Sequence, residues 1–253
     1  MEFRFALPQP PSGPLVEMTF EETERMLLKR LEAEKDKPID ALWQLARLYQ
    51  QSKQIEKGLA CLERVLAEMP DAEGKASAVL GLGQMMESAQ DFQAAVRYYK
   101  EAFALEPVQT DVWYFINNNL GYSLNQLGDF VEGAKYCRAA IQANAGRPNA
   151  FKNLGIALQG LGELHEAARC FVTATRVDAA DPRSFHLLEK LLKEHPELEF
   201  EFQEELEACG KAVEFAAQRV AERKPVIYRG WRKHLALWSA KITRFFSRNS
   251  ANS

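Results

Sequence analysis

The residues best suited to chemistry are scattered along this 253-residue chain. Histidine and cysteine act as metal ligands, nucleophiles or general bases when they stand at short, paired spacings. The histidines fall in separate parts of the sequence and the cysteines form no C-x-x-C pair: His165, His186, His195, His234, Cys61, Cys137, Cys170 and Cys209. Isolated cysteines on apolar helix faces behave as small hydrophobic residues. We therefore expect no catalysis, no metal site and no cofactor, and the cysteine usage favours a reducing compartment.

The nearest approach to a phosphate-binding loop is a pair of glycines, Gly81 and Gly83. A dinucleotide-binding loop needs a third glycine at a fixed spacing. This pair lacks it and lies inside a helical pattern. We expect no small-molecule ligand.

Charge is distributed unevenly along the chain. Overall, 32 Lys and Arg residues against 35 Asp and Glu residues give a net charge of −3. Residues 223–253 hold eight Lys or Arg residues and no acidic residue, which leaves a net charge of −11 on residues 1–222. An acidic body opposes binding to the phosphates of a nucleic acid, so no nucleic-acid partner is expected.

No apolar run reaches the roughly 18–20 residues of a membrane-spanning helix. Met1–Pro14 also lacks the basic region and the apolar core of a secretory signal. The sequence therefore predicts a cytoplasmic protein, with peripheral attachment to a membrane as the alternative.

One apolar pattern recurs four times, in copies that begin near residues 39, 76, 114 and 148. The first half of each copy has spacings of i, i+3, i+4 and i+7, which place its residues on one face of a helix. The four first halves read Leu42-x2-Leu45-Ala46-x2-Tyr49, Val79-x2-Leu82-Gly83-x2-Met86, Asn117-x2-Leu120-Gly121-x2-Leu124 and Phe151-x2-Leu154-Gly155-x2-Leu158. The second halves read Gly58-x3-Leu62-x2-Val65, Ala95-x3-Tyr99-x2-Ala102, Gly133-x3-Cys137-x2-Ala140 and Ala167-x3-Phe171-x2-Ala174.

This pattern resembles the tetratricopeptide repeat (TPR), a unit of 34 residues with the signature W-x2-L-G-x2-Y followed by Ala, an aromatic residue and Pro. The resemblance covers four units over residues 38–181, at about 39–72, 76–109, 114–147 and 148–181. It implies an all-α, right-handed superhelical solenoid of paired antiparallel helices with terminal capping helices. Pro70 and Pro107 end the first two units as in the family, whereas the first unit has Leu42 where Trp is common.

Glycines inside the first helices predict close contact between helices. A glycine within a helix costs about 1 kcal/mol relative to alanine, so Gly83, Gly121 and Gly155 indicate that a neighbouring helix packs against each of them. Gly128 and Gly162 match left-handed residues at helix ends, and Asp91 and Asp129 match helix N-caps. The three or four extra residues before units two and three predict longer first helices.

In the family, the first helices of successive units line a concave groove that usually binds peptides. The resemblance carries this role to Trp43, Arg47, Gln84, Asn118, Asn119, Tyr122, Asn125, Asn149, Lys152, Asn153 and Ile156, and it also places Glu87 on this face. An asparagine amide donates and accepts together, so the row of amides predicts a grip on an extended peptide backbone, with Trp43, Tyr122 and Ile156 as apolar anchors.

One known use of the family, the binding of heat-shock chaperone tails, needs Lys or Arg at inward positions. This chain has Trp43, Gly81, Phe115 and Asn119 there. We therefore do not expect chaperone binding.

Segments outside the four units complete the predicted organisation. Residues 1–18 form a flexible Pro-rich segment, and residues 19–37 form an N-terminal packing helix that begins with a capping box at Thr19 and Glu22. Residues 182–224 form a degenerate fifth unit and a capping helix. The capping helix carries one continuous apolar stripe of Phe202, Leu206, Cys209, Val213, Ala216 and Val220.

Residues 225–253 form a basic amphipathic tail. Such a helix can lie in a membrane interface, bind a partner, or fold back on the acidic body, and the sequence leaves these three alternatives open. The residues predicted to make a membrane or partner contact are Trp231, Arg232, Lys233, Trp238, Arg244 and Phe245. Taken together, we expect a scaffold or adaptor that binds a protein or peptide in a TPR groove, or alternatively a scaffold docked on an anionic membrane through residues 226–246.

Overall fold

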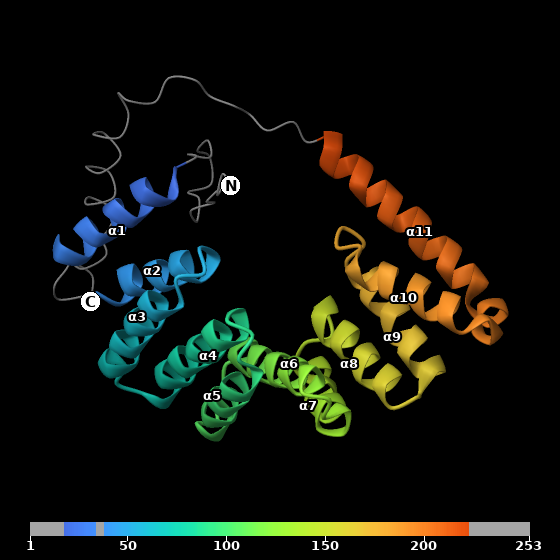
Figure 1. Cartoon of the computed structure of the whole chain (residues 1–253), viewed down its shortest axis with the longest axis horizontal. Helices are drawn as coiled ribbons and strands as arrows, with labels where there is room; N and C mark the ends of the chain where they lie inside the picture. Colours follow the sequence, from blue (N-terminus) through green and yellow to red (C-terminus); the bar gives the residue numbers. More distant parts are fainter. Residues whose placement is uncertain (1–17, 34–37, 223–253) are drawn as a thin grey trace, which may run out of the picture. The chain divides into compact units, whose positions relative to one another are not determined.

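The computed structural model describes residues 18–33 and 38–222, which are helical apart from short connections, with no strand in these ranges (Figure 1). Thr19–Val220 form one compact unit. The helices are α1 (Phe20–Ala33), α2 (Ile39–Gln51), α3 (Ile55–Glu68), α4 (Ala72–Ser88), α5 (Phe92–Ala104), α6 (Thr110–Gln126), α7 (Phe130–Ala143), α8 (Pro148–Gly160), α9 (Leu164–Val177), α10 (Arg183–Glu194), the short 3-10 helix η1 (Pro196–Leu198) and α11 (Glu199–Glu222).

Helices α2 to α9 pack as four consecutive pairs, α2 with α3, α4 with α5, α6 with α7 and α8 with α9. Each second helix also packs on the first helix of the next pair, and α4 and α8 both contact α6 directly. The described residues thus form an all-α solenoid, as the repeat pattern predicts. A unit of two helices is too small to bury its own apolar face, so stacking is what gives the chain a continuous core.

The glycines of the first helices lie at the contact within each pair, as predicted. A Cβ atom at Gly121 would lie 2.5 Å from the sulfur of Cys137 and 3.0 Å from the carbonyl oxygen of Gly133. At Gly155 it would lie 2.5 Å from the ring of Phe171, and at Gly83 it would overlap the ring of Tyr99. These glycines are buried, so each allows a second helix to approach the backbone of its first helix.

The predicted helix ends are also confirmed. Asp91 accepts a hydrogen bond from the N–H of Ala94 at 2.9 Å. Asp129 is the N-cap of α7 in the same way. Gly128 and Gly162 have φ values of 81° and 79°. Helices α4 and α6 each have 17 residues against 13 in α2 and α8, because the extra residues before units two and three extend the first helices.

The N-terminal helix α1 packs against α2. Its capping box forms: the N–H of Thr19 donates to the Glu22 carboxylate at 3.1 Å, and the N–H of Glu22 donates back to the Thr19 hydroxyl at 3.2 Å. Leu27 is buried, whereas Leu28 is exposed. The hydroxyl of Tyr49 on α2 donates a hydrogen bond to the Glu24 carboxylate of α1 at 2.8 Å, and this bond links the two helices.

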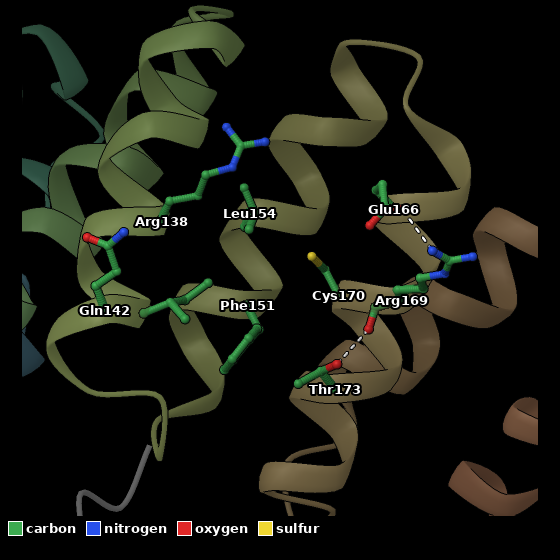
Figure 2. A pocket seen from close by; sticks show the side chains of 9 residues that line it. Arg138, Gln142, Phe151, Leu154, Glu166, Arg169, Cys170 and Thr173 are labelled. Atoms are coloured by element: carbon green, nitrogen blue, oxygen red, sulfur yellow. Dashed lines mark hydrogen bonds and ion pairs between the residues drawn. The ribbon is translucent and has the colours of Figure 1, made fainter.

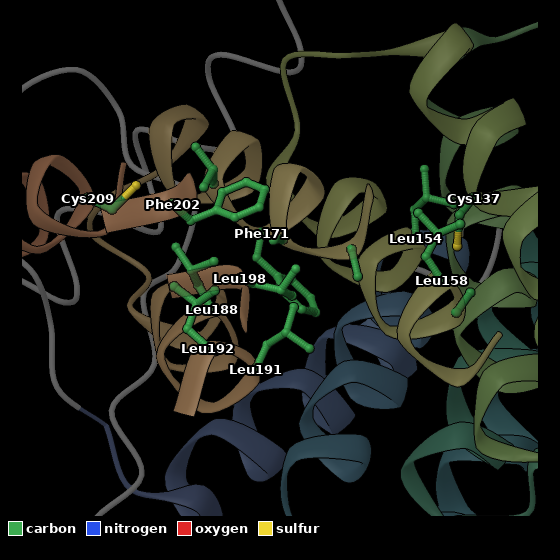
Figure 3. Packing of buried hydrophobic residues seen from close by; sticks show 14 of the residues in the cluster. Cys137, Leu154, Leu158, Phe171, Leu188, Leu191, Leu192, Leu198, Phe202 and Cys209 are labelled. Carbon is green, nitrogen blue, oxygen red and sulfur yellow. The ribbon is translucent and has the colours of Figure 1, made fainter. Parts of the chain in front are cut away.

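At the other end of the stack, α10, η1 and the first half of α11 close the core. Phe171 of α9 lies in one apolar cluster with Leu188, Leu198 and Phe202 (Figure 3). Along the stripe predicted for α11, Phe202 and Cys209 are buried, whereas Val220 at its end is 61% exposed. Helix α11 has 24 residues and α10 has 12, so at a rise of about 1.5 Å per residue α11 is about 18 Å longer than the helix before it.

Within the described ranges, no helix combines the length and the apolar character needed to cross a lipid bilayer.

Candidate functional site

The residues predicted for the groove lie on the first helices α2, α4, α6 and α8. We call them, together with Glu87, the first-helix surface: Trp43, Arg47, Gln84, Glu87, Asn118, Asn119, Tyr122, Asn125, Asn149, Lys152, Asn153 and Ile156. The structure divides this set in two. Four asparagines are buried, and the remaining members are half-buried or exposed.

The buried asparagines join α6 to α8. Asn153 donates from its side-chain nitrogen to the side-chain oxygen of Asn118 at 3.1 Å, and Asn125 donates to the backbone carbonyl of Asn153 at 2.8 Å. Asn118 in turn donates to Asn119 at 2.9 Å. These four side chains are between 3% and 9% exposed. The structure therefore gives the amide row a role inside the protein, and a role in holding a peptide stays a prediction.

A different contact joins α2 to α4. The side-chain nitrogen of Gln50 donates to the carbonyl oxygen of Gln84 at 3.1 Å and to the hydroxyl of Ser88 at 2.9 Å. Nearby, the ring of Trp43 lies over Gly81, where a Cβ atom would be 3.0 Å from the indole. The sequence pattern does not explain Gly81, and the structure does: the missing side chain leaves room for the half-buried Trp43.

The carboxylate of Glu87, on α4, lies near the hydroxyl groups of two tyrosines, Tyr99 and Tyr122. The hydroxyl of Tyr99 on α5 donates to Glu87 at 2.8 Å. Burial raises the pKa of Glu87 to about 7, and the hydrogen bond from Tyr99 acts against this rise. Burial also raises the pKa of Tyr122 on α6, and the nearby Glu87 carboxylate raises it further. Sequence reasoning placed Glu87 on this face without a role, because its partner Tyr99 comes from the second helix of the pair.

Lys152 lies at the α8 end of the surface. Lys152 donates to the side-chain oxygen of Asn149 at 3.2 Å. Burial lowers the pKa of Lys152, the charge of Arg183 lowers it further, and Asp181 opposes this. Ile156, on the same helix, is half-buried and packs against the core. Arg47 at the opposite end is exposed.

A pocket of about 430 Å³ lies elsewhere, among α7, α8 and α9 (Figure 2). Ile141, Phe151, Leu154 and Cys170 supply apolar side chains, and Arg169 is held by Glu166 at 2.9 Å and Glu201 at 3.3 Å. The remaining lining residues are Arg138, Gln142 and Thr173. The repeat pattern treats Phe151 as a core residue, so no sequence pattern indicated this pocket.

The thiols of the chain are poor nucleophiles. Burial raises the pKa of Cys137 to about 12 and that of Cys170 to about 11, so little thiolate forms near neutral pH. Among residues 18–33 and 38–222, no group of three His, Cys, Asp or Glu side chains is placed to hold a metal ion. The tail residues Trp231, Arg232, Lys233, Trp238, Arg244 and Phe245 lie outside the described residues.

Comparisons with known proteins agree with this architecture. Two models described as tetratricopeptide repeat match residues 39–105 and 87–148. No curated protein sequence matches the chain.

Three solved structures are similar in fold. BtubC (BKLC) from P. vanneervenii has a TM-score of 0.62 at 16% identity, over 83% of this chain and 93% of its own. PilW, described as a widely conserved type IV pilus biogenesis factor, has a TM-score of 0.59 at 20% identity, over 82% and 87%. YrrB, described as a TPR protein with an unusual peptide-binding site, has a TM-score of 0.52 at 20% identity, over 78% and 99%.

At these identities the likeness concerns the fold alone. The shared fold agrees with the paired helices, with the close contacts at the glycines and with the matches to the repeat family models. Residues 39–148 therefore belong to the tetratricopeptide repeat family.

Proposed function

We propose that this protein is a non-catalytic scaffold that holds an extended segment of a partner protein along the first-helix surface. The observation that carries the proposal is the direct contact of α6 with both α4 and α8, which makes the first helices of successive units one surface. Half-buried Trp43, Tyr122 and Ile156 are spread along it. The description of YrrB as having a peptide-binding site gives a precedent in a protein of similar fold.

Apolar anchors are required by the energetics of such a site. Micromolar affinity corresponds to about 8 kcal/mol, whereas one hydrogen bond contributes a net of about 0.5–1.5 kcal/mol. With the amides of Asn118 and Asn153 bonded to each other, the aromatic and aliphatic side chains must supply most of the binding energy.

A peptide selection tests this proposal. The full chain is immobilised and used to select from a phage-displayed library of random dodecapeptides. The variants Trp43→Ala and Ile156→Ala should each weaken the selected peptides about tenfold or more, because anchors carry most of the energy of an interface.

The control is Cys170→Phe, which fills the pocket among α7, α8 and α9 and should leave the affinity unchanged. If the selected peptides bound both surface variants with unchanged affinity and did not bind Cys170→Phe, the binding site would be that pocket. This result would contradict the proposal.

The second candidate is a scaffold docked on an anionic membrane through residues 226–246. Its support is the sequence of this segment, in which Trp231, Trp238 and Phe245 alternate with basic residues and which lies outside the described residues. Co-sedimentation with liposomes rich in phosphatidylserine compares the full chain with a chain that ends at Lys224. Equal pelleting of the two chains contradicts membrane docking.

A further inference from the structure

Glu87 is a carboxylate held in place on the first-helix surface, and its neighbours in the described ranges carry no positive charge. One of its oxygens accepts the hydrogen bond from the Tyr99 hydroxyl at 2.8 Å. Tyr99 is fully buried, so this bond fixes the carboxylate against the α5 side of the surface. The side chain of Glu87 itself is half-buried and remains accessible.

An aromatic ring stands beside this carboxylate. Tyr122 of α6 is near enough for the Glu87 charge to raise its pKa, after the effect of burial. The ring of Tyr122 contacts that of Phe92 of α5, with ring centres 5.9 Å apart and an angle of 78° between the planes. A carboxylate and a neighbouring aromatic ring can together bind a cationic side chain, the first by charge and the second by a cation–π contact.

Within the part of the chain that the structure describes, no residue supplies such a cation. Among the described residues, no Lys, Arg or His forms an ion pair with Glu87, and the groups that act on its titration are its own burial and the Tyr99 hydroxyl. The titratable groups that face it are Tyr99 from α5 and Tyr122 from α6. A half-buried carboxylate without a counter-charge is costly in free energy, and a ligand that brings a positive charge removes that cost.

We propose that Glu87 and Tyr122 form a seat for one Lys or Arg side chain of the bound segment, so that the partner presents a basic residue to the space between α4 and α6. This inference rests on the proposed function and names the chemistry of the ligand for that surface. Lys152 lies at the α8 end and Arg47 at the α2 end, so a basic residue is favoured at the α4–α6 position and disfavoured at either end of the surface.

The state of Glu87 makes the seat sensitive to pH. Burial raises its pKa to about 7, and a cation binds the deprotonated form. Affinity for a basic ligand should therefore increase by about tenfold between about pH 6 and about pH 8, because below the pKa a proton must leave before the cation enters.

The probes are peptides from the dodecapeptide selection described above, now scored for residue preference at each position. The wild-type chain should enrich Lys or Arg at one position, and Glu87→Gln should remove that preference. Glutamine keeps an oxygen that accepts the Tyr99 hydrogen bond, so the variant folds. Glu101→Gln, an exposed acid on α5, makes the same charge change away from the surface and should keep the preference.

A synthetic peptide then isolates the charge. One copy carries Arg at the enriched position, or homoarginine where Lys is enriched, and a second copy carries citrulline or homocitrulline, which has the same shape without the charge. Wild type should bind the charged copy about tenfold more tightly, and Glu87→Gln should bind both copies equally with no change between the two pH values. Tyr122→Leu should weaken the charged copy, and Tyr122→Phe should restore it.

The outcomes separate the two proposals. Peptides that depend on Trp43 and Ile156 but show no basic preference, or whose preference survives Glu87→Gln, overturn the cation seat and leave the proposed function standing. A selection that yields no peptide dependent on the first-helix surface overturns the proposed function, and the cation seat with it.

Discussion

The side chain of Asn153 donates a hydrogen bond to that of Asn118 across 3.1 Å, from one repeat to the next. Both amides are buried, with 3% and 7% of their surface exposed. Polar groups at such a depth are costly unless they are paired. This bond therefore contributes to the angle and spacing of α6 and α8, on which the shape of the first-helix surface depends.

The first prediction concerns this amide pair. Asn118→Ala and Asn153→Ala should each lower the free energy of unfolding by about 1–3 kcal/mol, because each leaves a buried partner without its hydrogen bond. The double variant should lower the free energy of unfolding by less than the sum of the two single effects. In the double variant neither amide remains buried without its partner. Urea denaturation of the four proteins measures this coupling. The control is Asn149→Ala, at a half-buried position outside the Asn118–Asn153 contact. Additive losses of unfolding free energy in the double variant would contradict the pairing.

The second prediction concerns the closest approach of two helices. Gly121→Leu should destabilise the protein by about 1–3 kcal/mol through overpacking, because even the first carbon of the side chain would lie 2.5 Å from the Cys137 sulfur. The midpoint of thermal unfolding should fall accordingly. Gly146→Leu, in an exposed turn, serves as the comparison. An unchanged midpoint for Gly121→Leu would mean that the repeats are aligned incorrectly.

The third prediction uses the titration of Glu87. Its pKa is about 7 in the folded protein against an ordinary value of 4.5, so the folded state binds the proton more tightly than the unfolded state does. The stability contributed by the protonated group is complete below about pH 4.5 and is lost as the pH rises to about 7. At about pH 8, Glu87→Gln should therefore be more stable than wild type by about 1–3 kcal/mol, a range reduced for partial exposure.

Thermal unfolding of the two proteins across this pH range provides the measurement. The difference between their midpoints should open between about pH 5 and about pH 7 and then stay constant. A difference that is flat over the whole range would show that Glu87 titrates like an exposed carboxylate.

The repeat architecture could be predicted from the sequence because it depends on local rules. Gly83, Gly121 and Gly155 stand at fixed offsets from the apolar positions, and Asp91 precedes its helix as an N-cap does. These features need only a helical period and a short-range cap. They identify the helices, their pairing and their closest contacts without any knowledge of how one unit meets the next.

The details of the surface could not be predicted in the same way, because they arise between units. The rotation of α6 relative to α8 decides whether the side chain of Asn118 faces a ligand or faces Asn153. The spacing of residues within one repeat does not predict this rotation. Glu87 acquires its raised pKa from burial beside Tyr99, a residue of another helix. Val220 lies on the predicted stripe of α11 and is nevertheless exposed, because the stripe records the helix period alone and not which neighbour covers each position.

The last prediction tests where the cap of the stack ends. Phe202 is buried in the cluster formed by α9, α10 and α11, whereas Phe200, two residues earlier on the same helix, is 92% exposed. Phe202→Ala should lower the free energy of unfolding by about 3–5 kcal/mol through lost burial and the cavity left behind. Phe200→Ala should change it by less than about 0.5 kcal/mol. The two variants remove the same side chain from the same turn region, so helix propensity and the unfolded chain are affected alike, and urea denaturation reports the burial difference alone. Equal costs would contradict the orientation of α11 and with it the closure of the core at this end.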